Sequence, residues 1–272
     1  MSQAFVINFL SILLMSLSAF FRHSLLLAVP AVLAFSGCSK KDEPAPTPVP
    51  DQGRIMFVNA APNVNVAAKM QVDEVEKASL TYGQTTNYQT LNAGARTLKV
   101  VGGTTTLVTQ MATIEKDKSY SFFVYNPGTS NASAGLLVND DLTAPATTPA
   151  PAKAKVRLVH LGQGLGTVNG QGTAVPINLS EAQTVGYADR IPNVAFGSAS
   201  SFLEINAGTF NLAITTGAAP TNTFQFNVGD GSGSGMGTKN YEAGKIYTIL
   251  VRGAESNLDN SLKPKAYVLT HN

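Results

Sequence analysis

Bulky apolar residues recur at every second position in several short segments of the chain. In one segment they fall at Phe210, Leu212 and Ile214, and in another at alternate positions from Tyr120 onward. A spacing of two places such side chains on one face of a β-strand. After Cys38 no window keeps a sustained 3.6-residue apolar period, and turn residues separate the segments roughly every 8 to 12 residues. The pattern therefore predicts short antiparallel strands that fold as β-sandwiches.

The strands belong to two divergent copies of one unit, because the same segments occur twice in the same order. The offset between matching positions grows from 101 to 114 to 127 residues, so the second copy carries two insertions of 13 residues each. Each copy also has an Asn-Ala-Gly turn, which places Gly94 and Gly208 where a tight turn needs a positive φ. The matching segments are residues 54–59 with 155–160, 82–83 with 196–197, 91–94 with 205–208, and 119–125 with 246–252.

These patterns predict an all-β protein with two tandem antiparallel β-sandwiches, immunoglobulin-like or of Greek-key topology. Proline-rich segments precede the first sandwich and separate the two, and proline favours the extended chain that is typical of spacers. The predicted parts are a signal peptide at 1–37, a Pro-rich tether at 38–53, a first sandwich at 54–142, a linker rich in Pro, Ala and Thr at 143–153, and a second sandwich at 154–272.

The N-terminal apolar run has the form of a bacterial lipoprotein signal. Residues 24–35 are mostly apolar, follow the basic Arg22, and end at two small residues, 36–37, directly before Cys38, the only cysteine. This arrangement resembles the lipobox, in which the peptide bond before the cysteine is cut and the thiol is acylated; a phenylalanine stands where leucine is usual. We therefore expect Cys38 to be the lipid-attachment site that binds the protein to the membrane. The alternative, an ordinary cysteine in a transmembrane helix, fits poorly with the polar Ser-Lys-Lys-Asp-Glu that begins directly after it.

The first 21 residues make this signal unusually long. Our preferred explanation is that translation starts at Met15; the alternative is an extra membrane segment at 4–21, whose 18 uncharged residues are near the lower length limit for spanning a bilayer. The acidic pair at 42–43 resembles a signal that some diderm bacteria use to send lipoproteins to the cell surface. We expect an outer-membrane lipoprotein exposed at the surface, with a periplasm-facing orientation as the alternative.

Composition and charge narrow the class of protein further. The 272 residues are 44% hydrophobic and 13% charged, with a single Cys and no Trp, which excludes a disordered chain, a disulfide scaffold and a coiled coil. The formal net charge is +2, and the basic residues are scattered along the chain. No nucleic-acid partner is expected, because phosphate binding needs clustered Lys and Arg.

Residues capable of catalysis or metal binding are few. After Cys38 the histidines are His160, expected at a strand end with a hydrogen bond to a loop, and His271, expected to be frayed near the C-terminus. Two distant histidines do not make a zinc site. Carboxylates cluster at 73–76 and at 140–141 without equivalents in the second copy. Solvated loops or strand edges explain them better than a glycosidase pair or a calcium site, so no catalytic residue, metal or cofactor is expected.

Two glycine-rich stretches and two tyrosines have structural interpretations. The stretches at 162–166 and 229–237 match neither a P-loop nor a dinucleotide fingerprint and are expected to be flexible hairpin loops. Tyr120 and Tyr247 open matching strands and are expected to form tyrosine corners, in which the hydroxyl bonds a nearby backbone group.

The best candidate for a contact surface is the segment 187–190, assigned to the first insertion of the second copy. Tyr187, Asp189 and Arg190 lie there. Tyr and Arg are enriched at binding hot spots, and loops on rigid sandwiches commonly carry function.

The recurring pieces resemble a known bacterial family. They are a first strand of type Arg/Lys-hydrophobic-x-Phe/Leu-Val-Asn/His, an aromatic-Gly pair, an Asn-Ala-Gly turn, and a late strand beginning at Tyr120 or Tyr247. Together they are similar to the domain of unknown function 4397, which often occurs in tandem in anchored lipoproteins. Residues 59–62 are similar to the family's His/Asn-Ala-Ser-Pro pattern, whereas the second copy departs from it at 160–163. The resemblance implies a fold and a location, and no activity.

We therefore expect a membrane-anchored cell-envelope lipoprotein that acts in non-catalytic binding, adhesion or scaffolding, with a glycan or a protein as its ligand. The main alternative is a hydrolase acting on an extracellular polysaccharide, and another is an accessory subunit of an outer-membrane uptake complex. Duplication favours binding, because linked modules gain avidity.

Overall fold

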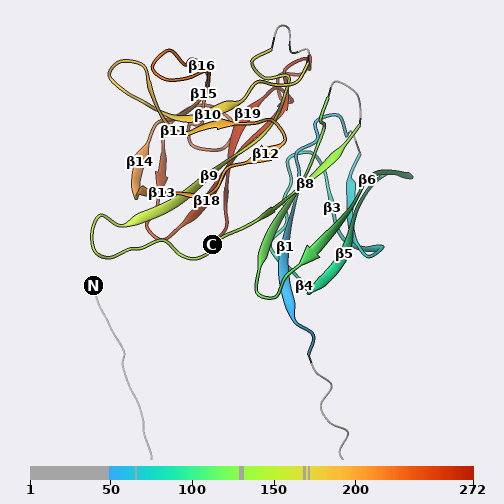
Figure 1. The fold of residues 1–272 in the computed structure, drawn as a ribbon. Coiled ribbons are helices and arrows are strands. Elements are labelled where there is room, and N and C mark those ends of the chain that lie inside the picture. The colour runs from blue at the N-terminus through green and yellow to red at the C-terminus, as the bar shows by residue number, and fades with distance from the viewer. Residues whose placement is uncertain (1–48, 65, 129–131, 168–169, 171) are drawn as a thin grey trace, which may run out of the picture. The chain divides into compact units, whose positions relative to one another are not determined.

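A computed structural model describes residues 49–272 except 65, 129–131, 168–169 and 171. The described residues form nineteen β-strands, and no α-helix occurs among them (Figure 1). Among these residues there is accordingly no helix long and apolar enough to cross a membrane. The signal peptide, Cys38 and most of the tether lie outside the described residues.

The first sandwich consists of two four-stranded sheets. Their inner faces enclose one hydrophobic core, to which Phe57, Met70, Leu98 and Phe122 contribute fully buried side chains. One sheet has the order β4 (Gln89–Asn92), β1 (Gln52–Asn59), β7 (Ser119–Tyr125), β8 (Ala134–Asn139), and the other has the order β3 (Val75–Leu80), β2 (Ala68–Val72), β5 (Gly94–Gly102), β6 (Thr105–Ile114).

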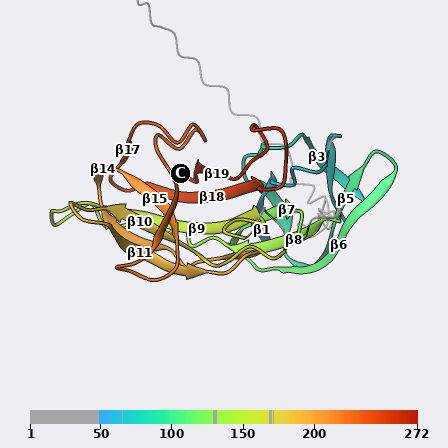
Figure 2. The ribbon, with the colours of Figure 1, turned by 90° about the horizontal axis from the view of Figure 1, so that it is seen from above.

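The second sandwich repeats this plan with more irregular strands. A short pair of strands, β14 (Gly208–Phe210) and β17 (Lys239–Tyr241), lies at one end (Figure 2). One sheet has the order β12 (Ser198–Ala199), β9 (Lys153–Gln163), β18 (Ile246–Ala254), β19 (Lys265–Thr270), with β13 (Leu203–Asn206) also paired to β9, and the other has the order β11 (Tyr187–Val194), β10 (Ile177–Ala182), β15 (Leu212–Thr216), β16 (Thr223–Asn227).

One strand pair in each sandwich is parallel, whereas the sequence predicts antiparallel strands throughout. β1 pairs in parallel with β7, and β9 pairs in parallel with β18. The other strand pairs within the described residues are antiparallel. A parallel pair needs a long crossover, and here the chain passes through the opposite sheet between the two strands. Because both copies contain this pair, it is a property of the repeated unit.

The two central strands of each sandwich are buried on both faces. β7 alternates between Phe122, which packs in the core of the first sandwich, and Phe123, which packs in a separate cluster with Val159 and Leu250 of the second. This cluster lies between the sheet that contains β1 and β7 and the sheet that contains β9 and β18. The two sandwiches therefore pack through equivalent sheets, which explains why β7 and β18 read as nearly continuous apolar runs.

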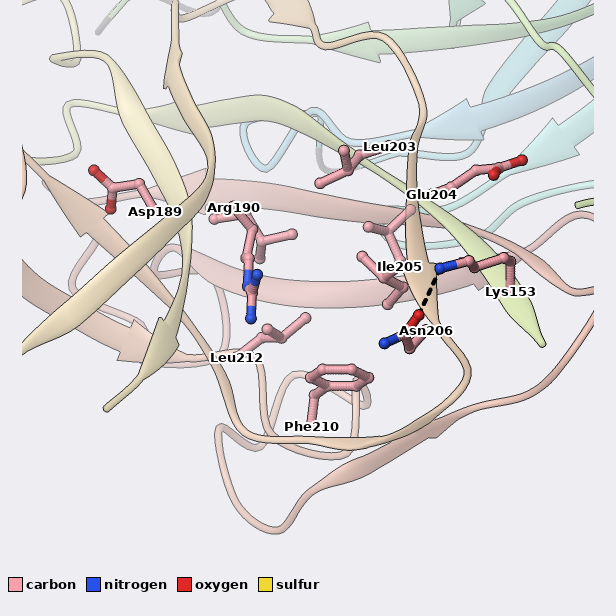
Figure 3. A pocket seen from close by; sticks show the side chains of 11 residues that line it. Lys153, Asp189, Arg190, Leu203, Glu204, Ile205, Asn206, Phe210 and Leu212 are labelled. Carbon is pink, nitrogen blue, oxygen red and sulfur yellow. Dashed lines mark hydrogen bonds between the residues drawn. The ribbon is translucent and has the colours of Figure 1, made fainter. Parts of the chain in front are cut away.

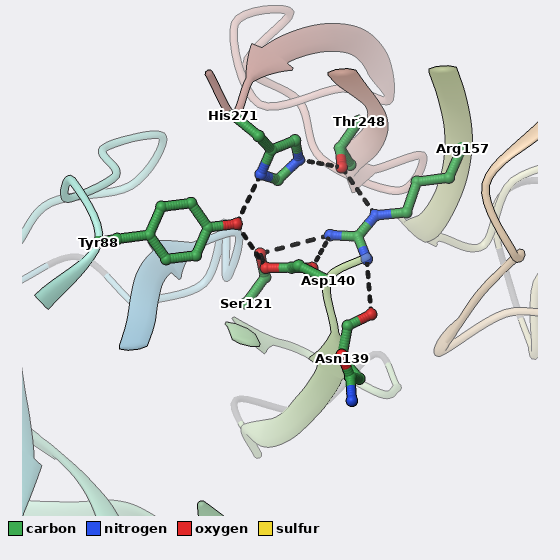
Figure 4. A network of polar contacts seen from close by, with 7 residues as sticks. All are labelled: Tyr88, Ser121, Asn139, Asp140, Arg157, Thr248 and His271. Atoms are coloured by element: carbon green, nitrogen blue, oxygen red, sulfur yellow. Dashed lines mark hydrogen bonds and ion pairs between the residues drawn. The ribbon is translucent and has the colours of Figure 1, made fainter. Parts of the chain in front are cut away.

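A polar network lies within this apolar interface (Figure 4). The guanidinium of Arg157 forms an ion pair with Asp140 at 2.6 Å, and both side chains are buried. Asp140 also accepts hydrogen bonds from Ser121 at 2.7 Å and from the Tyr88 hydroxyl at 2.6 Å. Arg157 Nε donates to the Thr248 hydroxyl at 2.7 Å. Buried charges are tolerated only when they are paired and hydrogen-bonded, as these are.

His271 closes the network, so the expectation that it is frayed is wrong. Its ring nitrogens lie 2.7 Å from the Tyr88 hydroxyl and 2.6 Å from the Thr248 hydroxyl. Because Tyr88 uses its proton on Asp140, Nδ1 of the histidine must be the donor to Tyr88. Nε2 then accepts from Thr248, whose oxygen in turn accepts from Arg157. The penultimate residue is therefore held as a neutral imidazole with a defined tautomer.

The aromatic-Gly pair of each copy is a docking point for the other copy. Tyr125, at the end of β7, packs edge-on against Phe196, and a Cβ at Gly197 would lie 2.7 Å from its hydroxyl. Arg252, the equivalent residue on β18, lies with its Cζ 4.5 Å from the centroid of the Tyr82 ring, next to the glycine of the first copy's pair. The repeated aromatic-Gly motif is thus explained by close packing between the copies.

Tyr120 and Tyr247 each bond the backbone five residues upstream. The Tyr120 hydroxyl accepts the backbone N–H of Glu115 at 3.2 Å, and the Tyr247 hydroxyl accepts that of Glu242 at 3.1 Å. Both rings are buried in their respective cores. This is the expected arrangement of a tyrosine corner.

The insertions of the second copy lie mainly in two loops. One is residues 164–176, between β9 and β10, and the other is residues 228–238, between β16 and β17. The glycine-rich part of the second loop is not a free hairpin, because Val268 of the edge strand β19 donates its backbone N–H to Gly231 at 2.8 Å. A Cβ at Gly231 would collide with the Val268 side chain, so the close contact requires glycine.

The interface ion pair predicts a large asymmetry between two neighbouring acids. We expect Asp140→Asn to lower the free energy of unfolding by about 3 to 5 kcal/mol, because it leaves the guanidinium of Arg157 buried without its counter-charge. Asp141→Asn removes an exposed carboxylate that pairs with Lys155 at 2.8 Å and should cost less than about 1 kcal/mol. Urea denaturation measures both; equal losses would contradict the prediction.

Candidate binding site

The two described histidines are structural. His160 lies at the position of Asn59 in the repeat; its Nε2 lies 3.0 Å from the Val175 carbonyl, and its Nδ1 lies 3.4 Å from the backbone N–H of Gly162. Asn59 likewise bonds the loop at its strand end. Burial lowers the pKa of His160 to about 4. Burial, with the nearby Arg157 charge, lowers the pKa of His271 to about 4 as well.

The acidic residues considered for catalysis are engaged in ion pairs. Asp140 is buried against Arg157, and hydrogen bonds from Lys155 and Thr143 lower the pKa of Asp141 to about 2. The acids of the first cluster each pair with a cation on the same sheet: Asp73 with Arg96, Glu74 with Lys99 and Glu76 with Lys69. Within the described residues, no group of three or more His, Cys, Asp or Glu side chains could hold a metal ion.

A pocket of about 380 Å³ opens at the side of the second sandwich, between the edge strands β11 and β13 (Figure 3). It reaches the core of that sandwich, because three of its apolar residues belong to the buried cluster there. The apolar residues that line it are Val156, Leu179, Leu203, Ile205, Phe210 and Leu212, and the polar ones are Lys153, Asp189, Arg190, Glu204 and Asn206.

Strand register places the polar groups around this pocket. Lys153 lies opposite Asn206 in the β9–β13 pairing, and its ammonium donates to the amide oxygen at 2.6 Å. Arg190 is on β11, where Glu181 of β10 accepts from its Nε at 2.8 Å. In Figure 3 the guanidinium of Arg190 points into the pocket, whereas the carboxylates of Asp189 and Glu204 point away from it. The pocket therefore has an apolar floor and a rim of hydrogen-bond donors.

The first sandwich has only a smaller hollow at the equivalent place, of about 230 Å³ between β3 and β4. There Arg96 occupies the repeat position of Phe210. It donates to the carbonyls of Asn92 and Ala93, both at 2.9 Å, and to Asp73 at 3.2 Å. In the first copy these bonds hold the arginine side chain beside the small hollow, whereas in the second copy the aromatic ring borders a larger pocket.

Of the three residues predicted as a contact surface, Asp189 and Arg190 line this pocket and Tyr187 does not. Tyr187 stacks on Phe224 with ring centroids 5.8 Å apart, and Asp189 accepts hydrogen bonds from Ser180 and Asn222. The sequence alignment of the copies predicts that all three lie in an inserted segment. In the structure they lie on β11, the counterpart of β3.

Sequence reasoning missed Lys153, Asn206 and Phe210. The sequence places Lys153 in the linker, whereas β9 begins there. In the sequence Phe210 reads as one more apolar position of a strand. The usable signal was the change from Arg96 to Phe210 at one repeat position, which replaces a charge with a ring beside an otherwise matched Asn-Ala-Gly turn.

Comparison with known families gives a match for the first copy. Residues 53–171 match the model of the family described as "Domain of unknown function (DUF4397)". The match confirms, for this part of the chain, the family that the resemblance of its motifs predicts. The match extends through the linker into the first strand of the second sandwich. No curated protein matches the chain.

Solved structures give only distant similarities. One is the "Putative cell adhesion protein" from Parabacteroides distasonis, with 9% identity, a TM-score of 0.21, and coverage of 82% of this chain and 99% of that one. Another is the family 26 carbohydrate-binding module from Eubacterium rectale Amy13K in complex with maltoheptaose, with 11% identity, a TM-score of 0.20, and coverage of 81% and 97%. A "putative cell adhesion protein" from Bacteroides eggerthii gives 12% identity and a TM-score of 0.20, covering 82% and 97%. Scores this low establish neither a shared fold nor a shared function.

The buried histidines predict a loss of stability in weak acid. Their pKa values are depressed in the folded state, so the unfolded chain binds more protons between about pH 6.5 and pH 4. Their contribution to stability is complete above pH 6.5 and falls as the pH drops toward 4. His160→Asn, which copies the first sandwich, should flatten this dependence relative to the wild type. Urea denaturation at half-unit pH steps measures the slope; an unchanged slope would show that His160 does not contribute.

Proposed function

We propose that this protein is a cell-envelope lipoprotein, acylated at Cys38, whose two β-sandwiches act in non-catalytic binding at the outer surface of the outer membrane. The ligand site is the pocket between β11 and β13 of the second sandwich. The first sandwich and the Pro-rich segment before it hold this site away from the membrane.

The N-terminal sequence supports the anchor. An apolar run behind Arg22 ends in two small residues before the only cysteine, and a polar, proline-rich segment follows. An export signal followed by an extended spacer is the arrangement expected of a domain displayed from a membrane. The acidic pair at 42–43 supports surface exposure over a periplasm-facing orientation.

The observation that carries the binding function is the difference between the two copies at one place. The first sandwich has only a small hollow beside Arg96, whereas the second has a larger pocket with an apolar floor and free donors. Small-molecule sites are typically concave, mostly apolar and equipped with a few placed polar groups. The pairing of the candidate catalytic acids with cations supports binding rather than hydrolysis.

Anchoring through Cys38 can be tested by fractionation. We expect the wild-type protein in the membrane fraction with a metabolically incorporated acyl chain. Cys38→Ser should be soluble and unlabelled, because no other thiol can be acylated. A Cys38→Ser protein that stayed in the membrane fraction would show that the N-terminal apolar run anchors the chain by itself.

Surface exposure can be tested by protease shaving of intact cells, followed by mass spectrometry. Peptides from residues 54–272 should be released from intact wild-type cells, while a periplasmic control protein stays intact. If these peptides are released only after the outer membrane is broken, the domains face the periplasm and this part of the proposal is wrong.

A further inference from the structure

We infer that the pocket between β11 and β13 binds an acidic sugar, a uronate or similarly charged unit of a glycan. This inference rests on the proposed binding function and names the ligand class of the same site. Its basis is the set of groups that the pocket presents to a ligand.

The polar groups that face the pocket are donors. Arg190 keeps its Nη1 protons after its Nε and Nη2 bond Glu181, and Lys153 keeps two protons after it bonds Asn206. The amide oxygen of Asn206 is taken by Lys153, which leaves the amide N–H groups. A neutral sugar hydroxyl must also donate, and a rim of donors serves it poorly, whereas a carboxylate only accepts.

The charge around the pocket favours an anion at the rim. Arg190 is neutralised by Glu181, whereas the ammonium of Lys153 donates to the neutral amide of Asn206. The two nearby carboxylates do not face the pocket: Asp189 is turned toward Ser180 and Asn222, and Glu204 points outward. Charge-assisted hydrogen bonds to a carboxylate are stronger and shorter than neutral ones, and Arg suits this acceptor because it can bind it with two parallel bonds.

The apolar floor of the pocket fits the ring of such a sugar. Phe210 lies at the base of the pocket with Leu212 and Ile205 beside it (Figure 3). The C–H face of a sugar ring is apolar and packs on an aromatic ring. The pocket volume of about 380 Å³ is at the small end of the range for ligand sites, about 300–1,000 Å³. One charged sugar ring with parts of its neighbours is therefore the expected occupant.

The first sandwich supplies an internal control. At the repeat positions of Lys153 and Phe210 it has Gln52 and Arg96, so it lacks both the free ammonium and the ring. Arg96 also occupies the hollow with its own hydrogen bonds. The second sandwich alone should therefore bind, with one ligand for each chain.

The experiment is isothermal titration calorimetry of the purified Cys38→Ser chain with trimers of galacturonate and glucuronate and with their neutral galactose and glucose counterparts. We expect a uronate to bind at one site per chain, at least about tenfold tighter than its neutral counterpart, and more weakly as salt is added. Bound sugar should be recovered uncut. Free acetate should not compete, because it lacks the ring.

Substitutions of the pocket residues test whether the uronate binds in this pocket. Arg190→Ala and Lys153→Ala should each weaken uronate binding by about tenfold or more, the usual value of a hydrogen bond between charged groups. Phe210→Leu keeps an apolar floor without the ring and should weaken binding about twofold to tenfold. The matched variant Gln52→Ala in the first sandwich should bind the uronate with the affinity of the unsubstituted chain. Thermal unfolding at an unchanged temperature checks that each variant folds.

Three results would overturn the inference. They are equal affinity for charged and neutral trimers, no binding of any uronate, and uronate binding that Arg190→Ala and Lys153→Ala leave unchanged. Neutral trimers that bind and lose affinity in Phe210→Leu would overturn the acidic class while leaving the binding function standing. Anchoring and surface exposure are decided separately by the fractionation and shaving experiments.

Discussion

The structure depends on the face-to-face packing of two equivalent sheets, with the ion pair of Arg157 and Asp140 enclosed between them. A sheet that is covered on both sides needs apolar residues on both faces, and a charge within it needs a complete set of partners. This constraint explains the doubly buried central strands, the polar network and the aromatic-Gly contacts. It also explains why the last residues are ordered, since His271 is the final member of the network.

The two copies diverged in a complementary way at this interface. Asp140 and His271 occupy the same repeat position, because Asp140 directly follows β8 and His271 directly follows β19. Each bonds a hydroxyl at a matched position of its own copy: Asp140 bonds Ser121, and His271 bonds Thr248. Likewise Tyr125 and Arg252 each pack on the other copy's aromatic-Gly pair. The two halves thus carry different chemistry at matched positions of the interface between them.

Divergence also separated the roles of the sandwiches. In the first, Arg96 borders a smaller hollow and is held by backbone and carboxylate contacts. In the second, the position carries Phe210, and Arg190 and Lys153 lie at the rim of an accessible pocket. The change removes one internal set of hydrogen bonds and exposes donors that a ligand can use. A single pocket is therefore compatible with duplication, because the two copies differ in the residues at this opening.

Local patterns in the sequence determined the strands, the repeat, the tyrosine corners and the family, because each rests on near-neighbour spacing: alternation decides which side chains share a face, and Gly in a turn decides φ. The parallel pairs and the place of His271 required the tertiary structure, because they depend on which distant strands become neighbours. The binding pocket was only half visible. Arg190 stood out as a residue type, but Lys153 and Asn206 meet only through strand pairing across 53 residues of chain, and Phe210 lines the same pocket only in the folded sandwich. Sequence spacing determines what one strand presents, whereas a site between sheet edges exists only once the sheets have packed.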